Sequence, residues 1–529
     1  MDLRLVSRLL GFVALFVGVA MVFSTPWALP LFGAAPKFES AGFFGLLGAI
    51  AVSLGTAGVL WRLGQGNKGK LYRKEAMAVV GLSWVLATIL GAIPYLLSGT
   101  ARGLDENGTP VRMGVADALF EAQSGFSTAG STVLTDLEVP SDDDHPPLVP
   151  RSILFWRAST QFLGGLGIIV LFVAVLGQGS AGKALMRAEM TGPTKEGTTT
   201  RMQHTAWVFA GIYTLLNGAL VVLLLLQGVS LFDSLCHAFP TLATGGFSNY
   251  NDSIGHFSRM PGIYAPLIEI TFIVFMILGG TNFALLYFAG MGRPRRLLAN
   301  VEWRVYMGVL LLATALVVIS GIGNHDFAST GEAIRYGTFN TVSVITTTGF
   351  VTHDFDAWNH FARGLLFLLM FVGACAGSTS GGLKLIRGIL LTKILRLEIE
   401  QAYRPSVVRP LRLGGETLDD PDLRKNVLLF TCLFLVVVVV AWLVLIAVEP
   451  DSTWHKAGMR PDQKFVDLGS GIAATMNTVG PGLGIVGATR TYSDFTAPTK
   501  LIFAFLMLVG RLELFAVLVL FMPRFWMKR

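Results

Sequence analysis

The stretch Phe339-Asn-Thr-Val-Ser-Val-Ile-Thr-Thr-Thr-Gly-Phe350 decides how the rest of the chain is read, because its core occurs four times. Each copy is a short polar motif with a glycine, preceded by a short, partly apolar run and followed by a polar loop and a long apolar segment. The four copies are Thr128-Ala129-Gly130, Ala243-Thr244-Gly245, Thr347-Thr348-Gly349 and Thr478-Val479-Gly480. Copies separated by roughly a hundred residues indicate an internal repeat.

The composition is that of a membrane protein. The chain is 53% hydrophobic and 14% charged, with a mean hydropathy of +0.61, whereas soluble domains carry about 25% charged residues. A segment of about 20 apolar residues spans a bilayer, and residues 427–448 form such a run. The net charge of +7 does not indicate nucleic-acid binding, because the basic residues gather in alternating loops.

The apolar segments predict ten membrane spans. Two come first, at about 9–32 and 41–63, and the first is too long for the core of a typical signal peptide, the alternative reading. Four pairs follow, each with a shorter segment between its members. The predicted pairs are 76–97 with 153–176, 207–226 with 267–288, 305–322 with 365–383, and 428–448 with 501–522.

The shorter segments predict half-spans. They cover 115–127, 231–243, 333–346 and 465–477, and each ends at one of the repeated motifs. Segments of about 13 residues cannot cross a bilayer and are typical of re-entrant helices. Their irregular ends are tolerated at membrane depth only where protein or a watery cavity surrounds them. Asp117, Asp233 and Asp467 are expected at the helix starts, where a carboxylate complements the helix dipole.

This pattern predicts an all-α membrane protein with four pseudo-symmetric helix–pore-loop–helix units around one pore, plus two extra N-terminal transmembrane helices. The expected divisions are residues 1–70 for those two helices, then 71–190, 191–300, 301–412 and 413–529 for the units. Lys and Arg gather in the loops between units and at the chain ends, whereas the loops around the motifs are acidic or mixed. The positive-inside rule therefore predicts that both termini are cytoplasmic and that the motifs enter from outside.

The motif chemistry fits a cation. Backbone carbonyl oxygens can replace the hydration shell of a monovalent cation without trapping it. Glycine permits positive φ and a close approach of backbone to ion. The alternative is that each Thr-Gly pair merely ends a helix, which four matched copies disfavour.

The motifs resemble those of the Trk/Ktr/HKT superfamily of cation transport proteins. The resemblance rests on 121–130, 237–248, 340–350 and 478–484, and covers the chain from about residue 76 onward. The two additional N-terminal spans resemble the bacterial TrkH/TrkG type. Pro240, Leu242, Asn477 and Val479 depart from the family pattern. In the first motif the resemblance implies that Gly130 goes with potassium rather than sodium.

The resemblance implies K⁺ as the transported ion, with no organic cofactor on this chain, and a location in the bacterial inner membrane. It implies the motif residues as the ion-binding filter. It also implies a homodimer in membrane lipid and a cytoplasmic TrkA-like nucleotide-binding subunit as partners.

Two features below the filter are candidate gates. The run Ala376-Gly377-Ser378-Thr379-Ser380-Gly381 weakens an apolar segment, and the resemblance implies an intramembrane loop that obstructs the pore. Tight packing of small residues is the alternative for this run. Arg511 stands where the other units have a small residue, and the resemblance implies an electrostatic barrier to cations; a structural salt bridge is the alternative. Glu269 is expected to be a paired structural acid or an interface residue rather than an ion ligand.

We therefore expect potassium uptake through a channel-like pore. A proton- or sodium-coupled symporter is the alternative within transport, which the few intramembrane acids disfavour. A membrane-embedded enzyme is a distant alternative, since the eight histidines and scattered acids form no catalytic constellation.

Overall fold

The computed structural model describes residues 1–30, 37–66, 72–138, 147–167, 202–406, 411–413, 416–418, 421–512 and 514–527. Helices dominate, as the sequence predicts. Two short antiparallel hairpins, which an all-α prediction leaves out, join β1 (Ala101–Leu104) to β2 (Pro110–Arg112) and β3 (Leu411–Leu413) to β4 (Glu416–Leu418).

The helices follow the predicted order of long and short segments. The first two, α1 (Leu3–Val22) and α2 (Ser40–Leu63), pack side by side against α3. The remaining principal helices are α3 (Arg73–Leu97), α4 (Val115–Phe126), α5 (Arg151–Leu166), α8 (Met202–Leu226), α9 (Leu231–Ala243), α10 (Ala265–Gly279), α11 (Phe283–Gly290), α12 (Pro294–Ala299), α13 (Val301–Gly323), α14 (Thr330–Ile345), α15 (His360–Leu369), α16 (Leu385–Tyr403), α17 (Pro421–Val448), α19 (Lys464–Met476) and α20 (Ala497–Arg511).

Short elements complete the described chain. They are η1 (Thr25–Ala28), η3 (Ser253–Ser258), η4 (Phe355–Ala357), α18 (Ser452–Lys456), η5 (Pro461–Gln463), η6 (Gly484–Val486), α21 (Phe515–Leu518), η7 (Val519–Phe521) and α22 (Pro523–Trp526).

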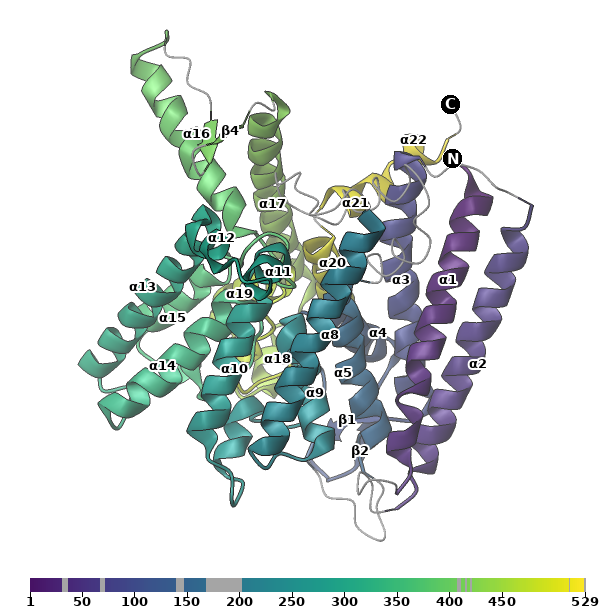
Figure 1. The fold of residues 1–529 in the computed structure, drawn as a ribbon. Coiled ribbons are helices and arrows are strands. Elements are labelled where there is room, and N and C mark those ends of the chain that lie inside the picture. Colours follow the sequence, from purple (N-terminus) through teal and green to yellow (C-terminus); the bar gives the residue numbers. More distant parts are fainter. Residues whose placement is uncertain are drawn as a thin grey trace.

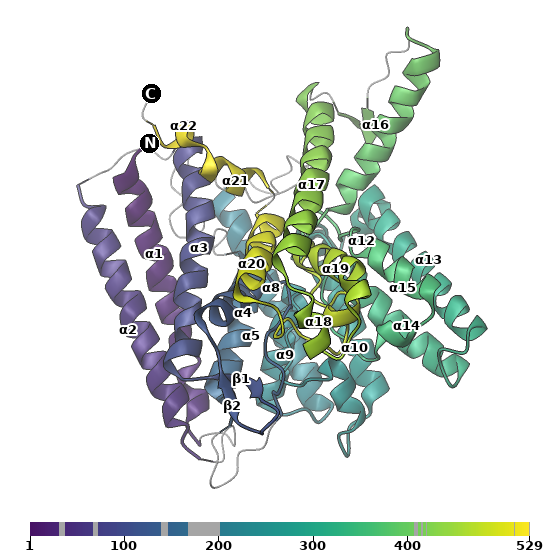
Figure 2. The ribbon, with the colours of Figure 1, turned by 180° about the vertical axis from the view of Figure 1, so that it is seen from behind.

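The long helices form a layer of roughly aligned rods with the short helices among them (Figure 1). Both termini lie at the same end, and β1 and β2 lie at the opposite end. The reverse view shows α4 and α19 between the flanking helices, with the upper part of α16 and α17 standing clear of the bundle (Figure 2).

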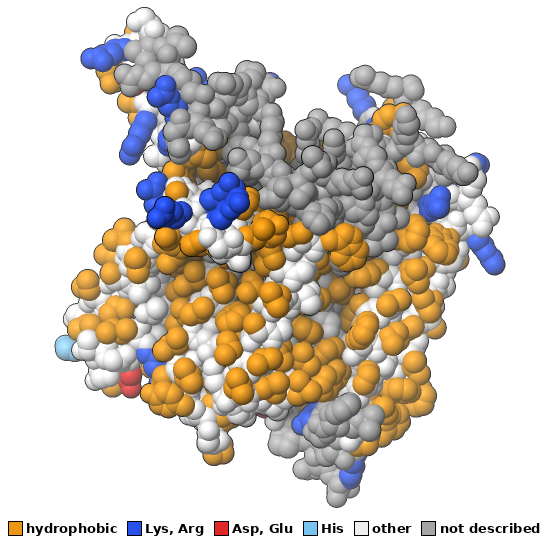
Figure 3. Space-filling model, in the orientation of Figure 1, with side chains coloured by type: hydrophobic (Ala, Val, Ile, Leu, Met, Phe, Trp, Pro, Cys, Tyr) orange, Lys and Arg blue, Asp and Glu red, His pale blue; other side chains and the backbone are white. Residues whose placement is uncertain are grey.

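An apolar band covers the middle of one face of the molecule. Figure 3 shows hydrophobic side chains across this band, with Lys and Arg gathered mainly beyond its upper edge. Leu311 and Leu312 on α13 are 69% and 63% exposed, which water would disfavour but lipid tails would not. Among the described residues, six helices are long and apolar enough to cross a membrane, or up to eight if each bent pair counts as one span.

Three predicted spans differ from continuous helices. The predicted span 267–288 is α10 followed by α11, bent by 108°, and 501–522 is α20 followed by α21 and η7, bent by 116°. The predicted span 365–383 ends as a helix at Leu369, and irregular chain runs from there to Lys384 before α16 begins. Glycines lie at two of these breaks, at Gly279-Gly280 and in the run 373–382, and glycine weakens a helix.

The other predicted segments agree more closely. The predicted half-spans fall within three residues of α4, α9, α14 and α19 at each end, and α9 matches at both ends. The first predicted span is wrong at its end, because α1 stops at Val22 and the 3-10 turn η1 follows. The predicted span 153–176 is helical as α5 to Leu166, and its part from residue 168 lies outside the described residues.

All four short helices begin with an acid in their first turn: Asp117, Asp233, Glu332 and Asp467. Ser230 and Ser329 cap α9 and α14 by accepting the N–H groups of Asp233 and Glu332. These caps satisfy N–H groups that the start of a helix leaves unpaired. The positive N-terminal end of the helix dipole stabilises the negative charge of the acids.

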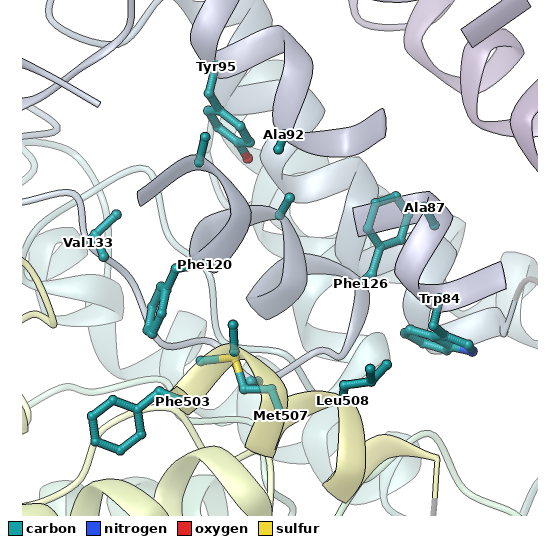
Figure 4. Packing of buried hydrophobic residues seen from close by; sticks show 14 of the residues in the cluster. Trp84, Ala87, Ala92, Tyr95, Phe120, Phe126, Val133, Phe503, Met507 and Leu508 are labelled. Atoms are coloured by element: carbon teal, nitrogen blue, oxygen red, sulfur yellow. The ribbon is translucent and has the colours of Figure 1, made fainter. Parts of the chain in front are cut away.

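The apolar core lies between the short helices and the long ones that surround them. Figure 4 shows Trp84 on α3, Phe120 and Phe126 on α4, and Phe503 and Met507 on α20, converging on one packed region. All five side chains are fully buried. This core fixes the end of α4, and with it the first copy of the repeated motif.

Candidate functional site

Each short helix ends in the same unusual way. Thr128, Thr244, Thr347 and Thr478 have φ between 54° and 58°, a left-handed conformation that β-branched residues rarely adopt. In all four copies the N–H of the residue after the threonine donates to the carbonyl five residues earlier, at 2.8–2.9 Å. The N–H of the threonine donates three residues back. This is a Schellman cap, so the motifs do end helices, and they do so in four matched copies.

The caps correct the alignment of the second copy. The glycines two residues after the threonines are Gly130, Gly246, Gly349 and Gly480, and all four have positive φ, between 74° and 98°. Gly245, which the sequence places in register with the other three, is not among the residues with positive φ. The aligned tripeptide is therefore 244–246 rather than 243–245, and Ala243 is the last residue of α9.

The four motifs meet in a closed ring. A Cβ atom built on Gly130 would collide with the carbonyl oxygen of Gly245, one on Gly246 with that of Thr348, and one on Gly349 with that of Val479. A Cβ on Gly480 would lie 2.9 Å from the carbonyl oxygen of Ala129, which closes the circuit. The backbones of successive motifs therefore touch in the order first, second, third, fourth, first, with no room for a side chain at any of the four glycines.

Polar groups without a protein partner lie at this ring. The hydroxyl oxygens of Thr128 and Thr478 are buried and make no hydrogen bond within the described protein. Buried hydroxyl groups are normally satisfied, so such oxygens favour a site where water or a cation supplies the missing partner. No group of three or more His, Cys, Asp or Glu side chains suited to a metal ion occurs among the described residues. The oxygens available at the ring are those of backbone and hydroxyl groups, which suit a weakly held monovalent cation.

A buried amide supports the second motif from behind. Gln161 on α5 donates from Nε2 to the Gly245 carbonyl oxygen at 2.6 Å and accepts from the Phe247 N–H at 3.1 Å. Sequence reasoning missed Gln161, because a single glutamine in an apolar segment carries no spacing signal.

A buried ion pair joins the first two motifs. Arg157 on α5 contacts Glu121 on α4 at 2.6 Å, and both side chains are nearly inaccessible to solvent. Glu121 also accepts from the Val133 N–H, beyond the first motif, and Arg157 donates to the Ser248 carbonyl oxygen, beyond the second. The Arg157 guanidinium stands 3.5 Å from the centre of the Phe247 ring. The pair thus fixes the outer sides of two neighbouring motifs relative to one another.

Glycines in the following helices let them approach the caps. A Cβ on Gly164 would collide with the carbonyl oxygen of Phe126, and one on Gly510 with that of Met476; at Gly279 the distance to the Leu242 carbonyl oxygen would be 3.2 Å. Phe126, Leu242 and Met476 each lie two residues before their threonine. Close packing of the helix backbone against the cap therefore explains the glycine in each of these three helices.

The run Ala376–Gly381, which we call the gate loop after the role that the sequence predicts for it, lies against the helix caps of the ring. Thr379 donates through its hydroxyl group to the carbonyl oxygens of Leu242 at 2.7 Å and Gly279 at 2.9 Å. The Gly381 N–H donates to the Thr347 hydroxyl at 3.1 Å. A Cβ atom on Gly381 would collide with the hydroxyl oxygen of Thr478. The loop thus touches the caps of the second, third and fourth motifs.

The other loop residues complete this placement. Ala376, Ser380 and Gly381 are buried, Gly377 is exposed, and Ser378 is half-buried. The N–H of Phe283 donates to the Gly377 carbonyl oxygen at 3.0 Å, so the bend between α10 and α11 holds this side of the loop.

Arg511 links the gate loop to the first unit. Its guanidinium donates to the carbonyl oxygens of Thr379 at 2.8 Å and Gly164 at 2.6 Å. These two acceptors place its charge beside the loop, at the end of α20. Glu269 is a paired acid as expected, with both oxygens bonded to Arg335 at 2.6 and 2.7 Å.

Comparisons with known proteins show the family and the overall fold. The family model TrkH, described as "Cation transport protein", matches residues 47–528. The Trk system potassium uptake protein TrkH of Escherichia coli K12 is 32% identical over 99% of this chain and its own whole length, and TrkG of the same strain is 28% identical. The crystal structure of the potassium transporter TrkH from Vibrio parahaemolyticus matches with a TM-score of 0.82 and 30% identity, covering both chains completely. This chain belongs to the TrkH family of cation transport proteins.

Proposed function

We propose that this protein carries potassium into the cell through a pore whose filter is the ring of four motifs. The observation that carries the proposal is the closed circuit of backbone contacts from Gly130 through Gly246 and Gly349 to Gly480. Such a ring offers carbonyl oxygens from four sides, which is how a pore replaces the hydration shell of K⁺. The potassium-uptake names of the relatives support the same ion.

The filter residues in this proposal are the aligned tripeptides 128–130, 244–246, 347–349 and 478–480. Their backbone oxygens bind the ion, and the unpartnered hydroxyl groups of Thr128 and Thr478 add ligands at the inner side. Each short helix directs its negative C-terminal end toward the ring, which favours a cation there.

The gate loop and Arg511 form the barrier below the filter. The loop lies against three of the four caps, and Arg511 adds a positive charge beside it. Both features oppose a cation that leaves the filter inward, one by occupying space and the other by repulsion.

The membrane is the bacterial inner membrane, with both termini cytoplasmic, and the four units follow the divisions given for the sequence. A homodimer and a TrkA-like cytoplasmic subunit remain part of the proposal on the resemblance alone. We do not propose symport, because the buried acids have fixed protein partners. Asp117, Glu121 and Glu269 pair with Lys500, Arg157 and Arg335. The other buried acids among the described residues accept hydrogen bonds from protein donors: Glu75, Glu302, Glu449 and Asp467.

Ion flux into liposomes tests the proposal. Purified protein should carry K⁺ and Rb⁺ in preference to Na⁺, and equal permeability to all three would contradict a selective filter. Deletion of residues 376–381 and the substitution Arg511→Ala should each raise K⁺ flux. A folded deletion variant with unchanged flux would contradict the assignment of the gate loop.

A further inference from the structure

Side chains from two different units hold the backbone of Ala376, one at its N–H group and the other at its carbonyl oxygen. Its N–H donates to Glu302 Oε1 at 2.7 Å, and its carbonyl oxygen accepts from Asn282 Nδ2 at 2.6 Å. Asn282 lies at the bend between α10 and α11, whereas Glu302 is the second residue of α13. Ala376 is therefore the fixed point at which the gate loop begins.

The same carboxylate also holds the chain beyond the gate loop. Glu302 Oε1 accepts a second hydrogen bond, from the Ile386 N–H in the first turn of α16, at 3.2 Å. A single oxygen atom thus ties together the two chain segments that flank residues 377–385. Hydrogen bonds to a charged acceptor are roughly twice as strong as neutral ones, so this closure is a strong one.

The surroundings of Glu302 give its carboxylate few other roles. The residue is 8% exposed, and a buried carboxylate is costly unless hydrogen bonds compensate its lost hydration. Two backbone N–H groups and the charge of Lys384 supply that compensation here, and all three belong to the chain around the gate loop. The stability of the ionised carboxylate at this place and the closed position of the loop are therefore linked.

Glu302 also lies next to the surface of the molecule. It follows α12 directly, and Arg293, Arg295 and Arg296 around the start of α12 are exposed. Figure 3 shows blue side chains gathered at the upper edge of the apolar band over this part of the molecule. A displacement of the α12–α13 junction would carry the carboxylate away from the loop.

We propose that Glu302 is a positioning residue that latches the gate loop in its blocking position. The inference rests on the proposed function, since a latch matters only if the loop obstructs the pore. Loss of the carboxylate releases the Ala376 and Ile386 N–H groups together and shifts the loop toward an open position.

Flux measurements on the full-length protein in liposomes test the latch. Glu302→Ala should raise K⁺ flux about tenfold, a shift of about 1.4 kcal/mol in the closed–open equilibrium. Glu302→Gln keeps an acceptor oxygen in place and should raise flux less. Glu75→Ala is the matched control, because Glu75 is also a buried carboxylate in the first turn of a long helix, but it accepts from the Asp2 N–H, far from the loop. Its flux should equal that of the unaltered protein.

The deletion variant separates a latch from a general packing role. In protein that lacks residues 376–381, Glu302→Ala should add nothing, because there is no loop left to release. If the two changes instead multiply, or if the deletion raises flux but Glu302→Ala alone does not, the latch proposal is overturned.

Cysteine labelling reports the loop position independently of flux. Cys375 lies next to the loop and is fully buried, as is Cys236 on α9, whereas Cys432 is exposed and is first replaced by serine. Glu302→Ala should increase the rate at which a membrane-permeant maleimide modifies Cys375, without changing that of Cys236. Faster labelling of both would mean general loosening and would overturn the latch.

The two readouts also separate this inference from the gate on which it rests. Faster Cys375 labelling in Glu302→Ala would support the latch even where deletion of the loop left flux unchanged, which would contradict the gate. Raised flux after the deletion, with no effect of Glu302→Ala on flux or labelling, would contradict the latch alone.

Discussion

At the scale of single residues, the four left-handed threonines are the least expected feature of the molecule. A β-branched residue with φ near 55° carries strain on the order of 1–3 kcal/mol, which persists only where its surroundings fix it. The Schellman caps and the glycine–carbonyl contacts provide that constraint. Sequence inspection aligned the copies on Gly245, since Gly245 and Gly246 are both glycines; an alignment on the threonines would have given the register of the structure.

The register predicts a difference between two adjacent substitutions. Gly246→Ala should abolish K⁺ flux and lower thermal stability, because its Cβ would collide with the Thr348 carbonyl oxygen in a backbone conformation that alanine rarely adopts. Gly245→Ala should be milder, since its Cβ meets only the end of the Gln161 side chain, at 2.6–2.8 Å. K⁺ flux and melting temperature are measured for both variants. A greater loss of flux and stability in Gly245→Ala than in Gly246→Ala would favour the alignment on Gly245.

Asp356, in the turn η4, predicts a pH dependence of stability. Burial raises its pKa to about 6, although the Gly484 N–H and the charge of Arg363 oppose that rise. Since the folded protein holds this proton more tightly than the unfolded chain, stability from this group falls as pH rises from about 4 to about 6. The span of that change is up to about 3 kcal/mol.

Thermal melts in detergent between pH 4 and pH 7 measure this effect. The difference in melting temperature between the unaltered protein and Asp356→Asn should change between about pH 4 and pH 6 and stay constant above pH 6. A difference that is independent of pH would contradict the raised pKa.

At the scale of elements, the four short helices could be predicted because length and motif agree. A 13-residue apolar run followed by a polar turn is too short to cross, and three of the four begin with a visible Asp. The breaks in three spans could not be predicted from hydropathy, because residues 267–288 and 501–522 are apolar enough to be read as single spans despite Glu269 and Arg511. They depend on backbone contacts with other units, such as that between Phe283 and Gly377.

Two glycine substitutions test how the second helix of a unit meets the cap of its own unit. Gly164→Ala should destabilise the protein by roughly 1–3 kcal/mol, because its Cβ would overlap the Phe126 carbonyl oxygen in a packed interface. Gly211→Ala on α8 has open space at its Cβ and should be neutral or slightly stabilising. Melting temperatures of the purified variants make the comparison, and equal effects would contradict the packing role of Gly164.

At the scale of the whole molecule, the ring depends on contacts between units that are far apart in the sequence. The buried pair of Arg157 and Glu121 is the strongest such tie between the first two motifs. Arg157→Met should cost about 3–5 kcal/mol, because it leaves Glu121 buried without its cation.

An exposed ion pair serves as the control for Arg157. Arg259 and Asp252 pair at 2.5 Å, but the arginine side chain is 70% exposed, and Arg259→Met should cost less than about 1 kcal/mol. Denaturation of both variants in the same detergent gives the comparison. Similar costs would mean that the buried pair is not a principal tie between the motifs.

The closed ring is made by one chain, so its four sides can be changed one at a time. In an assembly of four identical subunits, a single codon alters four positions together, and an arginine at the end of α20 would place four positive charges around the axis. Here Arg511 supplies one. If the ring is the filter, as we propose, selectivity and conductance can therefore be adjusted one side at a time, by mutation in the laboratory or by drift in a lineage, with three sides of the ring left intact.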